Sequence, residues 1–430
     1  MARAPQRQPK ALVPLRRPKV RGAPIAALAA ASAAALAGGA PAQLVLLTDA
    51  RYRGASACLD GSPYGVYFRP GRDSAHVLIV LQGAGFCTAL DEPALAHTSC
   101  AFRALQPPNA SSLGSSLGWP PAIGDGLTTL FGPPWLGLTS DDAALNPHLA
   151  DYSLAFLPSC DGTAWSSDVA EPLPVANGTA RVLLRGRENL DAALRWLKGE
   201  RGLALASQVV LAGFSSGAAA VYLQLDHVAS MLPASARLRG LADAGYMQNM
   251  VGELGTNFTH IRFANASRFW NASTNDACRR AFAGDEGSWA CLVSQTVLPF
   301  VATPLFAIAA SYDDTIPVFT GDAEIQCPYV FSKACSSLSL DWWRQYRNVT
   351  VANLAAAIPA NGSSHGLYIS ACAPHCSSIQ QAHNNTWQGI RVGGVSPADA
   401  FGAWLQGAAP ARYIDEGVYG DNLSCLGWRG

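Results

Sequence analysis

Residues 208–226, QVVLAGFSSGAAAVYLQLD, decide the fold of this chain. The stretch opens with the apolar run VVLA at 209–212, which is typical of a strand buried on both faces of a sheet. GFSSG follows at 213–217, and an alanine-rich stretch that favours a helix comes next. Strand, G-x-S-x-G and helix in that order predict a sharp turn that holds Ser215 out at the carboxyl end of the strand.

The chemistry of that turn explains its small residues. Glycine two positions before and two positions after Ser215 lets the strand and the helix approach each other closely. The amino end of the helix offers free backbone N–H groups, and its dipole favours a developing negative charge. A chain with 40 glycines contains this pattern easily by chance. The flanking strand and helix therefore carry the prediction that Ser215 is a nucleophile.

The rest of the chain alternates between strand-like and helix-like segments. Helical periodicity appears at 188–197, and a closing helix is expected at 396–406, while 257–289 is expected to be an insertion and 352–358 fits a helix or a strand. Apolar runs typical of strands occur at 64–68, 76–81, 154–160, 304–311 and 365–370. No linker divides the chain. The pattern predicts one α/β-hydrolase-like domain with a mostly parallel central sheet and long loop insertions.

Composition restricts the class of protein. The 430 residues are 49% hydrophobic and only 14% charged, which indicates a globular domain with a sizeable core. Thirty basic and thirty acidic residues cancel, so bulk charge gives no support for a nucleic-acid partner. Seven of the basic residues lie within the first 21 positions, and the first acid is Asp49, so the rest of the chain is mildly acidic.

The amino-terminal segment resembles a targeting sequence. A basic, proline-containing stretch is followed by an alanine-rich run at 23–40 and by Ala-Pro-Ala at 40–42. This order predicts a signal peptide or signal anchor over 1–42, and it leaves 43–430 as the hydrolase domain. An arginine-rich organelle transit segment is the alternative. Membrane contact is expected only if the apolar run stays uncleaved.

Two further features favour the secretory pathway and an extracellular or cell-wall location. Nine N-x-[ST] sequons occur, at Asn109, Asn177, Asn257, Asn265, Asn271, Asn348, Asn361, Asn384 and Asn422. Eleven cysteines lie beyond the leader, at 58, 87, 100, 160, 278, 291, 327, 335, 372, 376 and 425. They lack a C-x-x-C pair, so disulfides are expected rather than a zinc site. The odd count leaves at least one thiol free or paired between chains.

Ester hydrolysis needs a nucleophile, a base and a group that orients the base. In α/β-hydrolases these follow the order serine, acid, histidine, each just after a strand. Ser215, Asp313 and His375 meet both conditions. Asp314 competes with Asp313 as the acid, and we favour Asp313. The rivals of His375 are His365 and His383.

The surroundings of the predicted base bear on that choice. Cys372 and Cys376 flank His375, and disulfides at these cysteines would pin its loop. The same three residues would also make an incomplete zinc site without a fourth ligand, so we expect neither a metal nor another cofactor. For the oxyanion hole, the strand at 76–81 runs into QGAGFC at 82–87. We predict that the N–H groups of Ala84, Gly85 and Ser216 bind the oxyanion.

These motifs together resemble the pectin acetylesterase/Notum family. Segments similar to that family's landmarks, in its order, are CLDGSP at 58–63, QGAGFC at 82–87, CDGTAWSSD at 160–168, LLRGRENLDAAL at 183–194, GFSSGA at 213–218, ADAGY at 242–246, SYD at 311–313 and ISACAPHC at 369–376. The resemblance runs from about residue 58 to residue 404. It implies an α/β-hydrolase fold, the triad Ser215, Asp313 and His375, and oxyanion donors at Ala84, Gly85 and Ser216.

The chain departs from the family pattern at five positions around the predicted site. Gln82 replaces an acid, Ala84 a glycine, Phe86 a tryptophan, Phe214 a small residue, and Ser216 the alanine after the nucleophile. The two phenylalanines predict an altered pocket wall. The identity of the substrate is therefore less constrained than the chemistry.

Three functions follow from these observations. The first is a secreted serine carboxylesterase that deacetylates an acetylated cell-wall or extracellular polysaccharide through an acyl-enzyme. The second is a Notum-like esterase that removes a fatty acyl (palmitoleoyl) group from an acylated glycoprotein, which needs a deep apolar tunnel. The third is a non-catalytic glycan-binding surface protein on the same fold. The loss of a triad residue would favour the third function, and none is lost.

Overall fold

The computed structural model describes residues 40–89, 99–107, 113–124, 137–251, 257–284, 288–316, 337–379, 386–408, 411–419 and 421–428. The chain divides into two compact units, Met1–Gly38 and Gly39–Gly430. The leader predicted over 1–42 lies outside the described residues as far as residue 39. All that follows concerns the second unit.

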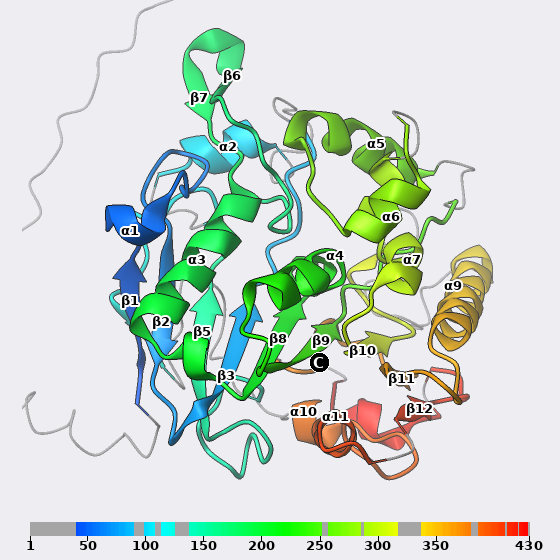
Figure 1. Cartoon of the computed structure of the whole chain (residues 1–430). Helices are drawn as coiled ribbons and strands as arrows, with labels where there is room; N and C mark the ends of the chain where they lie inside the picture. The colour runs from blue at the N-terminus through cyan, green and yellow to red at the C-terminus, as the bar shows by residue number, and fades with distance from the viewer. Residues whose placement is uncertain are drawn as a thin grey trace, which may run out of the picture. The chain divides into compact units, whose positions relative to one another are not determined.

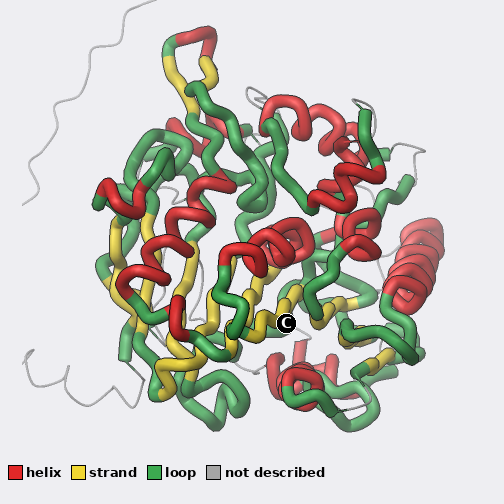
Figure 2. Tube along the Cα trace, in the orientation of Figure 1, coloured by secondary structure: helices red, strands yellow, loops and turns green. Residues whose placement is uncertain are grey.

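A ten-stranded sheet forms the centre of this unit (Figures 1 and 2). Its strands lie in the order β12-β11-β10-β9-β8-β3-β5-β2-β1-β4. From β12 to β5 every neighbouring pair is parallel, whereas β2, β1 and β4 add an antiparallel edge. The α/β class and the mostly parallel sheet are confirmed.

The strands of the large sheet are β1 (Ala42–Leu46), β2 (Gly65–Arg69), β3 (Asp73–Leu81), β4 (Ala122–Ile123), β5 (Tyr152–Leu157), β8 (Gln208–Phe214), β9 (Arg237–Asp243), β10 (Leu305–Ala310), β11 (Gly366–Ser370) and β12 (Arg412–Ile414), and a separate hairpin pairs β6 (Leu173–Val175) with β7 (Ala180–Val182). The α-helices are α1 (Ala50–Arg53), α2 (Cys100–Leu105), α3 (Gly186–Glu200), α4 (Ser216–Met231), α5 (Phe258–Trp270), α6 (Asp276–Ala281), α7 (Ser294–Val297), α9 (Ser337–Ala357), α10 (Thr386–Gly389) and α11 (Pro397–Leu405).

The apolar runs of the sequence become the buried strands of this sheet. Strands β5, β10 and β11 are buried along their whole length, as is β8 after its first residue. Helix α4 packs on β8, β9 and β3, and Figure 1 shows α3 and α4 in front of the sheet. Burial on both faces explains why these strands are continuous apolar runs rather than alternating ones.

The structure answers two open points of the sequence. The segment 352–358, which fitted either element, belongs to the end of α9 and is helical almost throughout. The expected insertion at 257–289 contains two helices, α5 and α6. Each begins at an asparagine cap, because the side chain of Asn257 accepts the N–H of His260, and that of Asn275 accepts the N–H of Ala277.

Disulfides join most of the cysteines in the described part of the chain. The pairs are Cys58–Cys160, Cys87–Cys100, Cys278–Cys291 and Cys372–Cys425. Cys327 and Cys335 lie outside the described residues. The expectation that disulfides at both cysteines flanking His375 pin its loop is half right, because Cys372 is bonded to Cys425, whereas Cys376 is free and buried. No helix among the described residues has the length and apolar character needed to cross a membrane.

Candidate active site

Ser215 occupies a strained turn between β8 and α4. Its φ of 55° and ψ of −128° lie in a region that side chains larger than glycine seldom adopt. The glycines on either side permit the turn sterically. A Cβ atom at Gly213 would lie 2.2 Å from the carbonyl oxygen of Gly217, and one at Gly217 would lie 2.1 Å from that of Leu81. The G-x-S-x-G pattern thus reflects two close backbone approaches.

Neighbouring strands hold this turn in place. The N–H of Ser215 donates to the carbonyl oxygen of Asp243 over 2.9 Å, which ties the turn to the end of β9. Gly83, two residues after the end of β3, packs against the turn from the other side. A Cβ atom at Gly83 would lie 2.6 Å from the Cβ of Ser215. The serine is therefore fixed between the carboxyl ends of β3 and β9.

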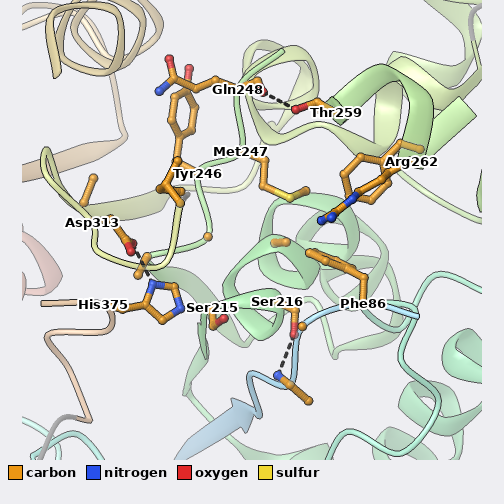
Figure 3. Close-up of a pocket in the computed structure, with 18 of the residues that line it drawn as sticks. Phe86, Ser215, Ser216, Tyr246, Met247, Gln248, Thr259, Arg262, Asp313 and His375 are labelled. Atoms are coloured by element: carbon orange, nitrogen blue, oxygen red, sulfur yellow. Dashed lines mark hydrogen bonds and ion pairs between the residues drawn. The ribbon is translucent and has the colours of Figure 1, made fainter. Parts of the chain in front are cut away.

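Asp313 and His375 form an ion pair next to this serine. The two residues follow the adjacent parallel strands β10 and β11, and His375 Nδ1 lies 2.7 Å from Asp313 Oδ2. The other carboxylate oxygen, Oδ1, accepts bonds from the hydroxyl and the N–H of Thr315 over 2.7 and 3.0 Å. Figure 3 shows the second ring nitrogen of His375 facing Ser215.

The rival residues lie elsewhere or make other contacts. Asp314 donates its N–H to the carbonyl of Ala373, while burial and the neighbouring charge of Asp313 raise the pKa of its carboxyl group to about 6. His365 lies at the opposite end of β11, where its Nδ1 accepts the N–H of Leu305. His383 falls outside the described residues.

Charge controls the protonation of His375. Burial lowers the pKa of this imidazole, but the Asp313 carboxylate and Cys376 raise it by more, so that the pKa stands well above its ordinary value of 6.5. A carboxylate that stabilises the imidazolium favours a histidine that accepts a proton during a reaction.

The predicted oxyanion segment lies beside Ser215, with one difference from expectation. The N–H of Ala84 donates to Ser216 Oγ over 2.8 Å and so already has an acceptor (Figure 3). Within the described part of the chain, the N–H groups of Gly85 and Ser216 donate to no acceptor. The N–H of Phe86, the next residue in the same segment, also donates to no acceptor among the described residues. The sequence predicts Phe86 in the pocket wall but does not identify its N–H as an oxyanion donor.

A cavity of about 330 Å³ opens at these residues. Its wall is mainly apolar, and it includes two arginines, Arg103 and Arg262. Side chains and backbone of Phe86, Met247, Met250, Phe263, Ile316 and Tyr246 contribute to this wall. Phe86 packs against Phe263 with ring centroids 5.3 Å apart, as expected for a pocket wall, whereas Phe214 is buried and does not line the cavity.

The zinc alternative loses one of its ligands. Cys372 is bonded to Cys425, so its sulfur cannot act as a thiolate ligand beside His375 and Cys376.

Parallel strands that present a strained serine, an aspartate and a histidine in this chain order define an α/β-hydrolase. Residues 36–426 match the model of a protein family described as "Pectinacetylesterase". The chain belongs to the pectinacetylesterase family and thereby to the carboxylic ester hydrolases.

Similar proteins support the assignment to the carboxylic ester hydrolases. The chain is 25% identical over 358 residues to palmitoleoyl-protein carboxylesterase notum1' of Xenopus laevis, which covers 81% of this chain and 64% of the relative. It is 25% identical to pectin acetylesterase 4 of Arabidopsis thaliana, over 89% of this chain and 88% of the relative. Pectin acetylesterase 5 of the same plant is 26% identical over 89% and 84%. The chain thus spans just under two thirds of the notum1' relative and most of each plant enzyme.

Proposed function

We propose that this protein is a secreted serine carboxylesterase that removes acetyl groups from an acetylated cell-wall or extracellular polysaccharide. The contact between His375 Nδ1 and Asp313 Oδ2, 2.7 Å long and beside the strained Ser215, carries the proposal. It supplies the oriented base that an unactivated serine needs in order to attack an ester.

The reaction proceeds in two halves. Ser215 Oγ attacks the ester carbonyl while His375 Nε2 takes its proton, and the negative charge of Asp313 stabilises the imidazolium. His375 then returns that proton to the departing sugar oxygen, which leaves an acetyl group on Ser215. In the second half His375 takes a proton from water, the hydroxide attacks the acyl-enzyme, and acetate departs as Ser215 regains its proton.

The negative oxygen of both tetrahedral intermediates needs donors. Gly85 and Ser216 are the predicted residues whose N–H groups have no acceptor among the described residues, and both line the cavity. We assign them as donors, with Ala84 holding Ser216 through its N–H. Donors fixed before the reaction stabilise the transition state without reorganisation.

One observation favours a second function. A methyl group is close in size to a water molecule, whose share of liquid volume is about 30 Å³. A cavity of about 330 Å³ therefore has room for much more than an acetyl group. The apolar side chains of Met247, Met250 and Ile316 in its wall suit a longer acyl chain, as in a protein fatty-acyl esterase.

Hydrolysis by the purified protein tests both functions. We expect acetate release from acetylated pectin and from 4-nitrophenyl acetate, and a Ser215→Ala variant should lose several orders of magnitude in rate. Ser116→Ala is the matched control, because it removes a buried hydroxyl that donates to Pro63 over 2.7 Å outside the cavity. Equal activity of wild type and Ser215→Ala would overturn the enzyme proposal.

The length of the acyl chain separates the two substrates. A series of 4-nitrophenyl esters from acetate to palmitate should show the highest kcat/KM at acetate if the polysaccharide assignment holds. A maximum at long chains would replace it with the fatty-acyl assignment.

A further inference from the structure

The hydroxyl of Ser216 has one hydrogen-bond function that the contacts of the protein do not use. A serine hydroxyl donates one hydrogen bond and accepts up to two. Ser216 Oγ accepts the N–H of Ala84 over 2.8 Å, so this contact uses only its acceptor side. Among the described residues no acceptor receives the proton of this hydroxyl. Ser216 is nevertheless only 3% exposed, so the proton points into a confined space.

The position of Ser216 limits where that space lies. As the first residue of α4 it directly follows Ser215, and both residues line the cavity. Figure 3 shows Ser216 between Ser215 and Phe86, above the segment that follows β3. The backbone N–H of Ser216, which faces no acceptor among the residues described, belongs to the same residue as the hydroxyl. An oxygen atom bound by that N–H would therefore lie close to Oγ.

We propose that the hydroxyl of Ser216 donates a hydrogen bond to the oxyanion during ester hydrolysis, as a side-chain donor beside the backbone N–H groups. This inference rests on the function proposed above. The N–H of Ala84 fixes Oγ from one side and leaves the O–H rotor to point at the developing charge. A donor held in this way costs little reorganisation when the charge appears. Ser216 is thus a catalytic residue directly after Ser215.

Two other roles predict different results. If Oγ serves only as the acceptor of the Ala84 N–H, removal of the hydroxyl frees that N–H to donate to the oxyanion and raises the rate. If the Ala84–Ser216 bond only ties the two segments together, its removal loosens the site for every substrate alike. The donor role alone makes the loss depend on how well the reacting atom accepts a hydrogen bond.

The variant Ser216→Ala keeps the backbone N–H and the Cβ atom while it removes the hydroxyl. For 4-nitrophenyl acetate we expect kcat to fall about 10²- to 10³-fold, as for the loss of other oxyanion donors, with KM changed less than about threefold. The Ki of a trifluoromethyl ketone, which forms an oxyanion with Ser215, should rise by a similar factor. Ser116→Ala should change neither value.

A thionoester substrate distinguishes a hydroxyl that donates to the oxyanion from a hydroxyl that only holds Ala84 and Ser216 together. Sulfur accepts hydrogen bonds weakly, so Ser216→Ala should cost the thionoester much less than the oxoester. Equal losses on both substrates, an unchanged rate, or a faster rate would each overturn the inference while the esterase assignment stands. A wild-type protein without esterase activity would overturn both.

Discussion

The carboxylate of Asp243 accepts the backbone N–H of Ser378 over 2.6 Å. Asp243 ends β9, and its carbonyl oxygen accepts the N–H of Ser215 over 2.9 Å. Ser378 lies three residues after His375, so one buried aspartate connects the turn of Ser215 with the loop of His375. Burial raises the pKa of the Asp243 carboxyl group to about 6.

Removal of that connection should impair catalysis. In Asp243→Ala the N–H of Ser378 loses its acceptor and the loop of His375 can shift. We expect kcat to fall about 10²-fold, the usual cost of a displacement near 1 Å at a catalytic group. Asp243→Asn keeps an acceptor oxygen and should retain most activity. An Asp243→Ala protein with wild-type kcat would contradict this role.

The choice between the two adjacent aspartates can be tested directly. Asp313→Asn should lower kcat by about 10⁴-fold, because the amide favours the wrong tautomer of His375. Asp314→Asn should lower it less than about tenfold, since Asp313, not Asp314, bonds the imidazole. Steady-state kinetics on 4-nitrophenyl acetate measure both, and the reverse order would reassign the acid.

The activity should depend on pH with a defined sign. His375 accepts a proton only when neutral, and its pKa stands well above 6.5 because Asp313 and Cys376 outweigh the effect of burial. The profile of kcat/KM should therefore fall as the pH drops, with the midpoint above pH 6.5. A flat profile from about pH 4 to 8 would count against His375 as the base.

Two disulfides should differ in how much they stabilise the folded protein. Cys372–Cys425 joins cysteines 53 residues apart and encloses His375, whereas Cys278–Cys291 joins cysteines 13 residues apart. Replacement of both cysteines by serine should cost about 4 kcal/mol of unfolding free energy for the first pair and about 3 for the second. Denaturant titration measures these costs.

The same two double variants give a second comparison. We expect only the loss of Cys372–Cys425 to reduce kcat strongly, since Cys372 lies three residues from the base. Equal kcat for both variants would show that this disulfide does not position His375.

The sequons give a prediction about glycosylation if the protein is secreted. Asn177, Asn265, Asn348 and Asn361 are exposed, and within the described residues their amide nitrogens donate no hydrogen bonds. The amide nitrogen of Asn271 instead donates to the carbonyl of Asp168 over 2.8 Å. Glycopeptide mass spectrometry should find the first four sites more fully occupied than Asn271. Unmodified asparagine at all four sites in protein from secreting cells would contradict the secretory assignment.

The parallel half of the fold was predictable from local patterns. Strands buried on both faces, such as β8 and β10, are short, nearly continuous apolar runs. The antiparallel edge of β1 and β4 was not predictable, because a short, partly exposed strand has no pattern that names its partner. Helix α5 was missed because its asparagines and serines obscure a helical period that starts at the Asn257 cap.

The candidate site divides in the same way. The positions of Ser215, Asp313 and His375, each just after an apolar run, predicted that they meet at the carboxyl edge of one parallel sheet, where they follow β8, β10 and β11. Apart from the contact between Asp313 and His375, the hydrogen bonds at that edge could not be predicted. The bond from the Ala84 N–H to Ser216 Oγ depends on how closely the turn after β3 approaches α4, which composition does not encode.

Cys376 has a practical consequence for anyone who works with this protein. The thiol is 5% exposed, burial raises its pKa to about 11, and it follows His375 directly. A protonated, enclosed thiol reacts slowly with alkylating reagents. Its labelling rate therefore reports how often the loop of His375 opens, without the need for a substrate or an engineered probe.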